Sequence, residues 1–338
     1  MKALMVTGPG KVEVLEVPDP VAGPADVLVK MKACGVCGAD PHAVREGGIV
    51  PGQSQTPLGH EPAGEVVFVG PDVADVKVGD HVVVDPMGVP DAIMGGGGAQ
   101  GALSDFIVVR NAVAGGNLKV IPGHVPWHVA ALNEPMAVAL RGVNRTRPKP
   151  GDKVVVFGAG PIGLGALLGY KRAGVGHVVV VDLQANRLEK ALRIGADAVV
   201  NSAEEDLVAR LIELHGEARD GFGRGGRPGT DIYLDAAGAS AVIETVLRVA
   251  KLGACLGVVG VQKKPIEVDF QDILATELTI AMAMGHPDEI FEVTDDIVDN
   301  WEKYAVIVSD QVPFTEVERA LELAGDPGAT DKVVVVFN

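Results

Sequence analysis

Residues 153–182, KVVVFGAGPIGLGALLGYKRAGVGHVVVVD, give the strongest indication of the fold of this chain. It opens with an apolar run typical of a strand buried on both faces, and a glycine-rich turn and an apolar helical segment follow. A second apolar run closes the stretch and ends in Asp182. The βαβ unit that binds a dinucleotide typically has this order of elements: strand, glycine turn, helix, strand and acidic residue.

The turn itself, Gly158-Ala159-Gly160-Pro161-Ile162-Gly163, matches the pattern G-x-G-x-x-G. Gly158 permits the tight turn, Gly160 lets a pyrophosphate approach the backbone, and Gly163 lets the helix pack closely on the strand. Pro161 and Ile162 stand at the helix N-terminus, whose free N–H groups and dipole favour anions. The motif alone is weak evidence in a chain with 44 glycines, because some glycines only shape turns. The complete order of elements around it favours cofactor binding.

Asp182 lies about 20 residues past the last motif glycine, where the dinucleotide fingerprint has its acidic residue. Its carboxylate can accept hydrogen bonds from both ribose hydroxyls and would repel a 2′-phosphate, which predicts NAD as the cofactor. No basic residue follows directly, since the next residue is Leu183. Arg187 could still approach a 2′-phosphate, so it is a candidate cofactor-binding residue and the strictness of the preference for NAD stays open.

The 338-residue chain is long for one hydrophobic core, which predicts two domains. Residues 1–146 carry short β-rich runs separated by Gly and Pro, typical of a small barrel or sandwich. Residues 147–285 alternate strands with helices and supply six strands, as a complete doubly wound Rossmann sheet requires. Residues 286–338 hold a strand-like run at 305–309 and end in a strand that we expect to return to the N-terminal domain. The predicted fold class is α/β, a Rossmann parallel sheet with a β-rich second domain.

Composition narrows the partners and the compartment. The formal net charge of −16 disfavours nucleic acid and anionic membrane surfaces as partners. The sequence carries no apolar run long enough to cross a membrane and no signal-peptide pattern. Three cysteines, an odd number, do not make a disulfide framework. We therefore expect a cytoplasmic protein that acts on a small molecule.

Four side chains ahead of the Rossmann domain could hold a metal ion: Cys37 after a strand, the neighbours His60 and Glu61, and Glu134. One thiolate, one imidazole and one or two carboxylates suit zinc, with a position left open for water or substrate. Each signal is weak alone, because a glycine-flanked cysteine is more often a packing residue. Cys34 and Cys37 also have the C-x-x-C spacing of a redox pair, although no thioredoxin-like βαβ pattern surrounds them.

Taken together, these motifs resemble the zinc-dependent medium-chain dehydrogenases, in the sorbitol, 2,3-butanediol and threonine dehydrogenase branch. The resemblance covers essentially the full length and rests on C-G-x-C-G-x-D-x-H at 34–42, G-H-E at 59–61, N-E-P at 133–135 and G-A-G-P-I-G at 158–163. It implies a GroES-like catalytic domain formed by 1–146 and 286–338, and a Rossmann NAD-binding domain at 147–285. It also implies a homodimer or homotetramer.

The resemblance assigns roles residue by residue. It implies that Cys37 and His60 are ligands of a catalytic zinc ion. Glu134 takes the third protein position, directly or through water, and Glu61 is an exchangeable ligand. Asp40 matches the carboxylate that orients the ligand histidine, a role that the general chemistry of metal sites also demands.

Other positions complete or depart from the family pattern. His42 matches the outer end of a proton relay that runs through the cofactor ribose, and Cys34 lies where the family has no ligand, which implies packing. The family usually has Ser or Thr two residues after the ligand cysteine, but this chain has Ala39, which has no exchangeable proton. Residues 86–105 contain no cysteine, so the four-cysteine structural zinc lobe is missing and we predict at most one zinc ion per chain.

These observations predict a zinc-dependent oxidoreductase that transfers hydride between NAD and a secondary alcohol or polyol, or the corresponding ketone. Zinc would act as a Lewis acid on the substrate oxygen. An alternative is a zinc-free NAD(P)H-dependent quinone or enoyl reductase on the same fold, against which the complete set of candidate ligands argues. A non-enzymatic NAD-binding protein is the third hypothesis, kept open by the missing relay hydroxyl.

Overall fold

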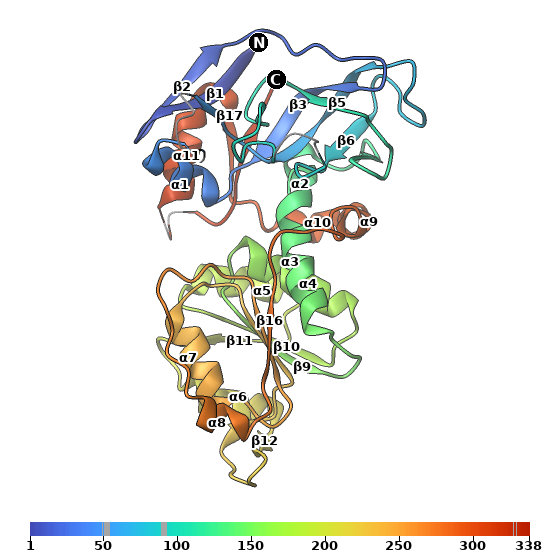
Figure 1. Cartoon of the computed structure of the whole chain (residues 1–338). Helices are drawn as coiled ribbons and strands as arrows, with labels where there is room; N and C mark the ends of the chain where they lie inside the picture. Colours follow the sequence, from blue (N-terminus) through green and yellow to red (C-terminus); the bar gives the residue numbers. More distant parts are fainter. Residues whose placement is uncertain (49, 51–54, 89–92, 327, 329) are drawn as a thin grey trace. The chain divides into compact units, whose positions relative to one another are not determined.

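The computed structural model describes residues 1–48, 50, 55–88, 93–326, 328 and 330–338. Its chain forms two compact units, shown with their elements in Figure 1. The β-rich unit comprises Met1–Pro135 and Ile290–Asn338, and the parallel-sheet unit comprises Met136–Glu289.

The parallel-sheet unit is built on six strands in the order β11-β10-β9-β14-β15-β16, and every neighbouring pair runs parallel. This is the strand order of the Rossmann sheet, in which the direction of winding reverses beside the first strand. The predicted fold class is therefore confirmed. The strands are β9 Lys153–Phe157, β10 His177–Asp182, β11 Ala198–Asn201, β14 Ile232–Asp235, β15 Cys255–Val258 and β16 Thr279–Met282.

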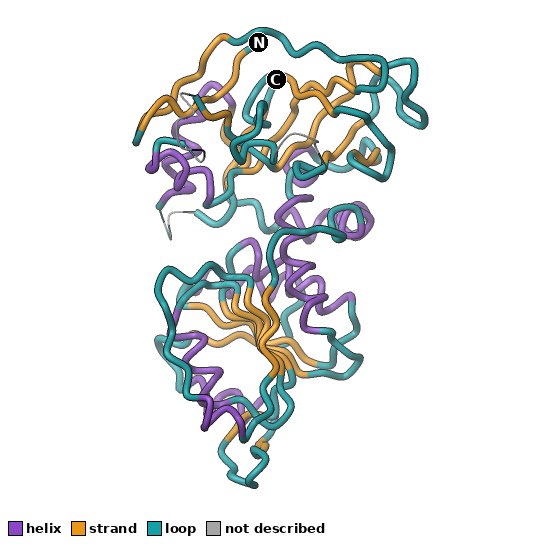
Figure 2. Tube along the Cα trace, in the orientation of Figure 1, coloured by secondary structure: helices purple, strands orange, loops and turns teal. Residues whose placement is uncertain are grey.

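Helices cover both faces of this sheet, as Figure 2 shows. The valines of β9 and β10 are therefore fully buried, which explains why these strands read as continuous apolar runs without alternation. The long Gly/Arg-rich loop between α6 and β14 contains a short hairpin of β12 and β13. The helices and the hairpin are α3 Asn133–Thr146, α4 Pro161–Arg172, α5 Ala185–Ile194, α6 Leu207–His215, α7 Ser240–Val249, α8 Phe270–Leu274, β12 Glu217–Ala218 and β13 Arg227–Pro228.

The boundaries between the two compact units lie at 135/136 and 289/290, whereas the predicted domain boundaries were 146/147 and 285/286. The packing of α3 accounts for this difference. A Cβ at Gly142 of this helix would lie 2.5 Å from the Val259 side chain, so most of the helix packs closely on the parallel-sheet unit. The Glu289 carboxylate accepts a hydrogen bond from Arg141 of the same helix, at 3.2 Å. Both the helix body and Glu289 therefore belong to the parallel-sheet unit.

The β-rich unit contains a three-stranded sheet, β2-β1-β4, and a larger sheet in the order β17-β18-β3-β5-β6-β8, with β7 also paired to β3. Buried and half-buried positions alternate along β3, as expected of a sheet with one face on a core. The strands are β1 Lys2–Gly8, β2 Lys11–Glu16, β3 Val27–Gly35, β4 Thr56–Pro57, β5 Glu61–Val69, β6 His81–Val84, β7 Phe106–Val109, β8 Leu118–Ile121, β17 Asp310–Pro313 and β18 Val333–Val336. The helices are α1 Ala39–Glu46, α2 Trp127–Ala130, α9 Glu292–Asp299, α10 Trp301–Ala305 and α11 Val317–Gly325, and a 3₁₀ turn, η1, spans Phe314–Glu316.

The terminal strand returns to the N-terminal part of the chain, as predicted: β18 pairs antiparallel with β3, with Val334 opposite Gly35. The strand predicted at 305–309 is wrong. Helix α10 extends to Ala305, and the strand β17 begins only at Asp310, next to the Lys332 carbonyl to which the Ser309 and Asp310 N–H groups donate. No helix within the described ranges is long and apolar enough to cross a membrane.

Candidate functional site

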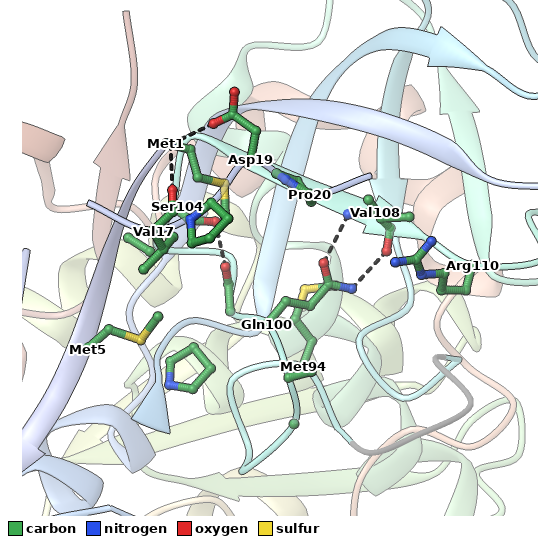
Figure 3. Close-up of a pocket in the computed structure, with 16 residues that line it drawn as sticks. Met1, Met5, Val17, Asp19, Pro20, Met94, Gln100, Ser104, Val108 and Arg110 are labelled. Atoms are coloured by element: carbon green, nitrogen blue, oxygen red, sulfur yellow. Dashed lines mark hydrogen bonds and ion pairs between the residues drawn. The ribbon is translucent and has the colours of Figure 1, made fainter. Parts of the chain in front are cut away.

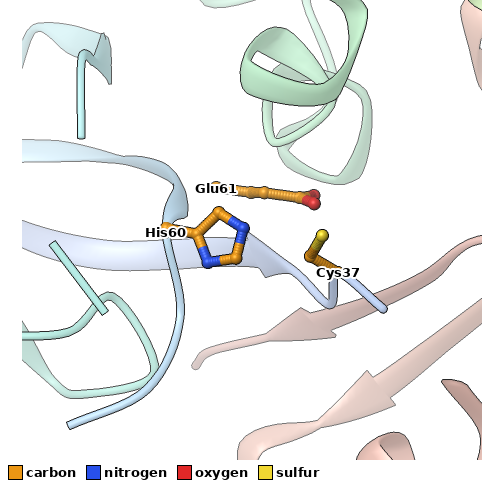
Figure 4. Close-up of side chains that lie close together, drawn as sticks. All are labelled: Cys37, His60 and Glu61. Carbon is orange, nitrogen blue, oxygen red and sulfur yellow. The ribbon is translucent and has the colours of Figure 1, made fainter. Parts of the chain in front are cut away.

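Cys37, His60 and Glu61 come together in the β-rich unit (Figure 4). One ligand atom from each, the Cys37 Sγ, a His60 ring nitrogen and a Glu61 carboxylate oxygen, lies within 4.8 Å of the others. The strand register explains the convergence, because β3 and β5 pair with Gly35 opposite Glu61. Cys37 lies two residues past the end of β3, and His60 directly precedes β5.

Gly35 makes room for the carboxylate. A Cβ at this position would lie 1.7 Å from a Glu61 carboxylate oxygen, so no other residue fits without moving Glu61. This glycine is required for space, since its φ is not in the left-handed region.

Asp40 holds the geometry of the cluster. It lies in the first turn of α1, is 2% exposed, and accepts a hydrogen bond from the Cys37 backbone N–H at 2.9 Å. Its other oxygen lies 3.6 Å from His60 Nδ1. Burial lowers the pKa of His60, but Asp40 and Cys37 together raise it more, so that this pKa lies well above its usual value. Asp40 therefore holds the Nδ1 side of the His60 ring, and Nε2 is the ring nitrogen that points away from Asp40.

Lys332 contacts this cluster and was not among the residues predicted from the sequence. It is 3% exposed, and its Nζ lies 2.6 and 2.5 Å from the two Glu61 carboxylate oxygens and 3.0 Å from the Val36 carbonyl oxygen. Burial lowers the pKa of Lys332, but the nearby Glu61 carboxylate acts in the opposite direction, and the net effect raises this pKa above its usual value. The available signal was a lysine placed directly before the apolar terminal strand.

The remaining predicted residues of this region lie around the cluster. Glu134 lies at the start of α3, and its charge raises the pKa of Glu61, an effect smaller than that of burial. His42 is exposed on α1. Cys34 is completely buried in the core of the β-rich unit, and burial raises the pKa of its thiol, which suits the predicted packing role.

The donor set fits zinc. A thiolate, an imidazole whose other nitrogen faces a carboxylate, and one or two carboxylates are what catalytic zinc sites use. Within the described part of the chain, the cluster of Cys37, His60 and Glu61 is the one group of three or more metal-ligating side chains that converge.

A separate cavity of about 480 Å³ lies elsewhere in the β-rich unit (Figure 3). It is lined by methionines, prolines and part of the segment that stands where relatives of the predicted family carry a structural zinc lobe. In that segment the Gln100 amide pairs with both backbone groups of Val108, at 2.7 and 2.9 Å, and so fixes the segment to β7. Of the predicted site residues, none is among the described residues that line this cavity. Residues 89–92 of the predicted lobe-free span 86–105 lie outside the described residues.

The glycine turn of the parallel-sheet unit has the shape that a pyrophosphate needs. Gly158 has a φ of 96°, and a Cβ at Gly163 would lie 1.7 Å from the Gly158 carbonyl oxygen. A Cβ at Gly160 would meet no atom within 4 Å, so the space beside its backbone is open. Gly160 caps helix α4, whose first two residues are Pro161 and Ile162. The free N–H groups of the helix N-terminus therefore lie beside the glycine turn.

Asp182 ends β10 at the same edge of the sheet. One of its oxygens accepts from the Ala159 N–H at 2.7 Å, and the other accepts from the N–H groups of Leu183 and Gln184 at 2.7 and 2.9 Å. Three backbone donors thus fix the position of the carboxylate beside the turn. Arg187 lies on α5, which follows directly.

Two family models match the chain: the alcohol dehydrogenase GroES-like domain at residues 23–117 and the zinc-binding dehydrogenase at residues 161–299. The (R,R)-butanediol dehydrogenase of Bacillus subtilis (strain 168) is 31% identical over 310 residues, which cover 85% of each chain. The chain belongs to the zinc-type medium-chain dehydrogenases. The sorbitol dehydrogenase of Rattus norvegicus is 33% identical over 82% of this chain and 80% of its own.

A solved alcohol dehydrogenase structure from Escherichia coli CFT073, complexed with NADH, superposes on this zinc-type dehydrogenase with a TM-score of 0.84. The two are 27% identical, and the match covers 100% of this chain and 99% of that one. The relatives named here are dehydrogenases of alcohol or polyol type, which favours the dehydrogenase hypothesis over the metal-free quinone or enoyl reductase.

Proposed function

We propose that this chain is an NAD-dependent, zinc-assisted dehydrogenase of a secondary alcohol or polyol, active in either direction. The observation that carries the proposal is the convergence of Cys37, His60 and Glu61 in a chain whose other unit presents a nucleotide turn with Asp182 beside it. The substrate class follows the relatives, of which one is named for butanediol and another for sorbitol.

Cys37 and His60 would hold the zinc ion, with Glu134 as the third protein ligand, directly or through water, and Glu61 as an exchangeable one. The bound ion would supply Lewis acidity toward the substrate oxygen. Asp40 positions two of these groups at once, because it accepts from the Cys37 N–H and faces His60 Nδ1.

The substrate proton needs an acceptor other than residue 39, where alanine has no hydroxyl. We assign this role to the Glu134 carboxylate ahead of Glu61, because Lys332 already lies against both oxygens of Glu61. His42 is the proposed outer end of the proton path, consistent with its exposure on α1.

NAD, not NADP, is the proposed cofactor. Three backbone N–H groups hold the Asp182 carboxylate beside the turn, and a 2′-phosphate would have to lie against it. Gly158, Gly160, Pro161, Ile162 and Gly163 would bind the pyrophosphate, and Arg187 lies on the helix that follows Asp182. The proposal includes one zinc ion per chain.

A homo-oligomer is part of the proposal. Strand β16 is the last strand of the parallel sheet, and its Ile280 and Met282 side chains are 44% and 62% exposed. An apolar edge strand with unpaired backbone groups favours pairing with a second copy. Light scattering on a size-exclusion column would test it, and a monomer at micromolar concentration would contradict it.

We also propose a cytoplasmic location. The three cysteines, Cys34, Cys37 and Cys255, are all unpaired, as a reducing compartment would keep them. Fractionation of the source cells would test this.

Zinc content and turnover test the central proposal together. We expect close to one zinc ion per chain in protein purified without chelator, and NAD-linked oxidation of at least one alcohol in a panel that includes 2,3-butanediol and sorbitol. Cys37→Ala should lose both. Cys34→Ala, which removes a buried thiol outside the cluster, is the matched control and should keep both.

Each other result has a definite meaning. Protein without zinc even after reconstitution would overturn the proposed mechanism, and two zinc ions per chain would reveal a second site. Turnover with any member of the panel would exclude a non-enzymatic NAD-binding protein.

A further inference from the structure

Three loops meet at the carboxyl edge of the parallel sheet, and Asp235 ties two of them together. Asp235 is the last residue of β14 and is fully buried. One carboxylate oxygen accepts from the backbone N–H groups of Ala237 and Gly238, at 3.0 Å each. The loop after β15 packs against the same turn, because a Cβ at Gly260 would lie 2.2 Å from the Gly238 nitrogen.

The other Asp235 oxygen accepts from the side-chain amide of Gln262, with Nε2 at 2.6 Å. Burial raises the pKa of Asp235, and the three N–H donors oppose this by favouring the ionised form. Both Asp235 oxygens accept hydrogen bonds, and the Gln262 amide therefore turns its NH₂ group toward Asp235 and its carbonyl oxygen away. That Oε1 atom is buried and has no hydrogen-bond partner within the described part of the chain.

A buried amide carbonyl without a partner is uncommon in folded proteins, and at a ligand-binding edge it suggests a ligand donor. The edge is the one where a doubly wound sheet binds its ligand. The nearby Gly158 turn contacts the same loop, since a Cβ at Gly158 would lie 3.1 Å from the backbone of Ala236 and Ala237. Gln262 is therefore one loop away from the proposed pyrophosphate site.

The two halves of the sheet decide which end of the cofactor reaches Gln262. A Rossmann sheet binds one nucleotide over each half, and Asp182, at the end of β10, marks the adenosine half. Strands β14 and β15 belong to the other half, over which a nicotinamide nucleotide would lie. The nicotinamide carries a carboxamide whose NH₂ group is a donor.

We propose that Gln262, oriented by Asp235, accepts a hydrogen bond from the carboxamide NH₂ of the nicotinamide and so fixes the ring of the cofactor. This rests on the proposed function as an NAD-dependent enzyme and adds a positioning pair to it. Because Asp235 binds the NH₂ group of Gln262, only the carbonyl oxygen of Gln262 is turned toward the ligand. This oxygen is a hydrogen-bond acceptor and therefore selects the NH₂ donor of the carboxamide.

Calorimetric dissociation constants for three ligands test the pair: NAD⁺, its 3-acetylpyridine analogue, which lacks the NH₂ donor, and ADP-ribose, which lacks the ring. We expect Gln262→Ala to weaken NAD⁺ binding about tenfold, the effect of one lost hydrogen bond of ordinary strength. Binding of the analogue and of ADP-ribose should change less than about twofold. Gln271→Ala makes the same chemical change at an exposed position on α8 and should leave all three constants unchanged.

Asp235→Asn provides a second, independent test. It should weaken NAD⁺ binding in the wild-type background, because an asparagine amide no longer forces the orientation of Gln262. In the Gln262→Ala background, Asp235→Asn should cause little further change in the ratio of the dissociation constants for NAD⁺ and the analogue.

The inference is overturned if Gln262→Ala leaves NAD⁺ binding unchanged, or weakens NAD⁺ and the acetylpyridine analogue equally. Equal weakening of all three ligands would also overturn it, because it would mean that the residue only supports the loop. Wild-type protein that binds neither NAD⁺ nor ADP-ribose would instead refute the proposed function, and with it this inference.

Discussion

Replacing Lys332 with methionine removes one partner of a buried ion pair and should strongly destabilise the β-rich unit. Lys332 is 3% exposed and Glu61 1% exposed, and their charged atoms lie 2.5–2.6 Å apart, so water cannot take the place of the ammonium group. Breaking such a pair from one side leaves a buried charge without compensation, which costs about 3–5 kcal/mol. The cost arises from burial of Glu61, more than from the attraction itself.

The assay can be confined to the relevant unit. Both tryptophans of the chain, Trp127 and Trp301, belong to the β-rich unit, so urea unfolding followed by tryptophan fluorescence reports on it. Wild type and variant should be compared at equal zinc content, because a ligand bound only to the folded state adds to its stability. The expected result is a fall of about 3–5 kcal/mol in the unfolding free energy of this unit.

Two further variants separate charge from packing. Lys332→Arg keeps the charge and should cost clearly less than Lys332→Met. Combining Lys332→Met with Glu61→Gln removes the unpaired charge, so we expect the double variant to be more stable than Lys332→Met alone. A loss below about 1 kcal/mol in Lys332→Met, or a double variant no more stable than the single one, would refute the reasoning.

Three other predictions concern the parallel-sheet unit. Burial, and then His177, whose Nδ1 lies 3.1 Å from His215 Nε2, lower the pKa of His215 to about 4, so the folded state keeps this ring neutral. The resulting stability, about 3 kcal/mol, is present above pH ~6.5 and is lost as the pH falls toward 4. A His215→Gln variant should show a flatter melting temperature between pH 7 and 4 than wild type, and equal slopes would contradict this. Gly163→Ala should abolish dinucleotide binding in calorimetry, because its Cβ would lie 1.7 Å from the Gly158 carbonyl oxygen; unchanged binding would show that helix and turn can separate at no cost. Asp182→Ala should gain NADP-linked activity relative to NAD, and an unchanged cofactor preference would count against the role of this carboxylate.

The nucleotide half of the protein could be predicted closely because its signals are local. The valine runs of β9 and β10 and the glycines between them occupy 30 consecutive residues, and the constraints on Gly158 and Gly163 act over a few bonds. The strand at 305–309 failed for the opposite reason. Its apolar run was compatible with both a helix end and a strand, and the Lys332 carbonyl decides where β17 begins.

The Rossmann order of elements, the glycine turn and the types of side chain that could hold zinc can all be predicted from the amino-acid sequence. These depend on period, spacing and donor chemistry, which are written in consecutive residues. The pairing of Lys332 with Glu61 and the orientation of the Gln262 amide by Asp235 become visible only in the folded chain. Each pair joins residues far apart in the chain, 271 and 27 positions respectively. Their energies come from burial and strand register, which exist only once the sheets have formed.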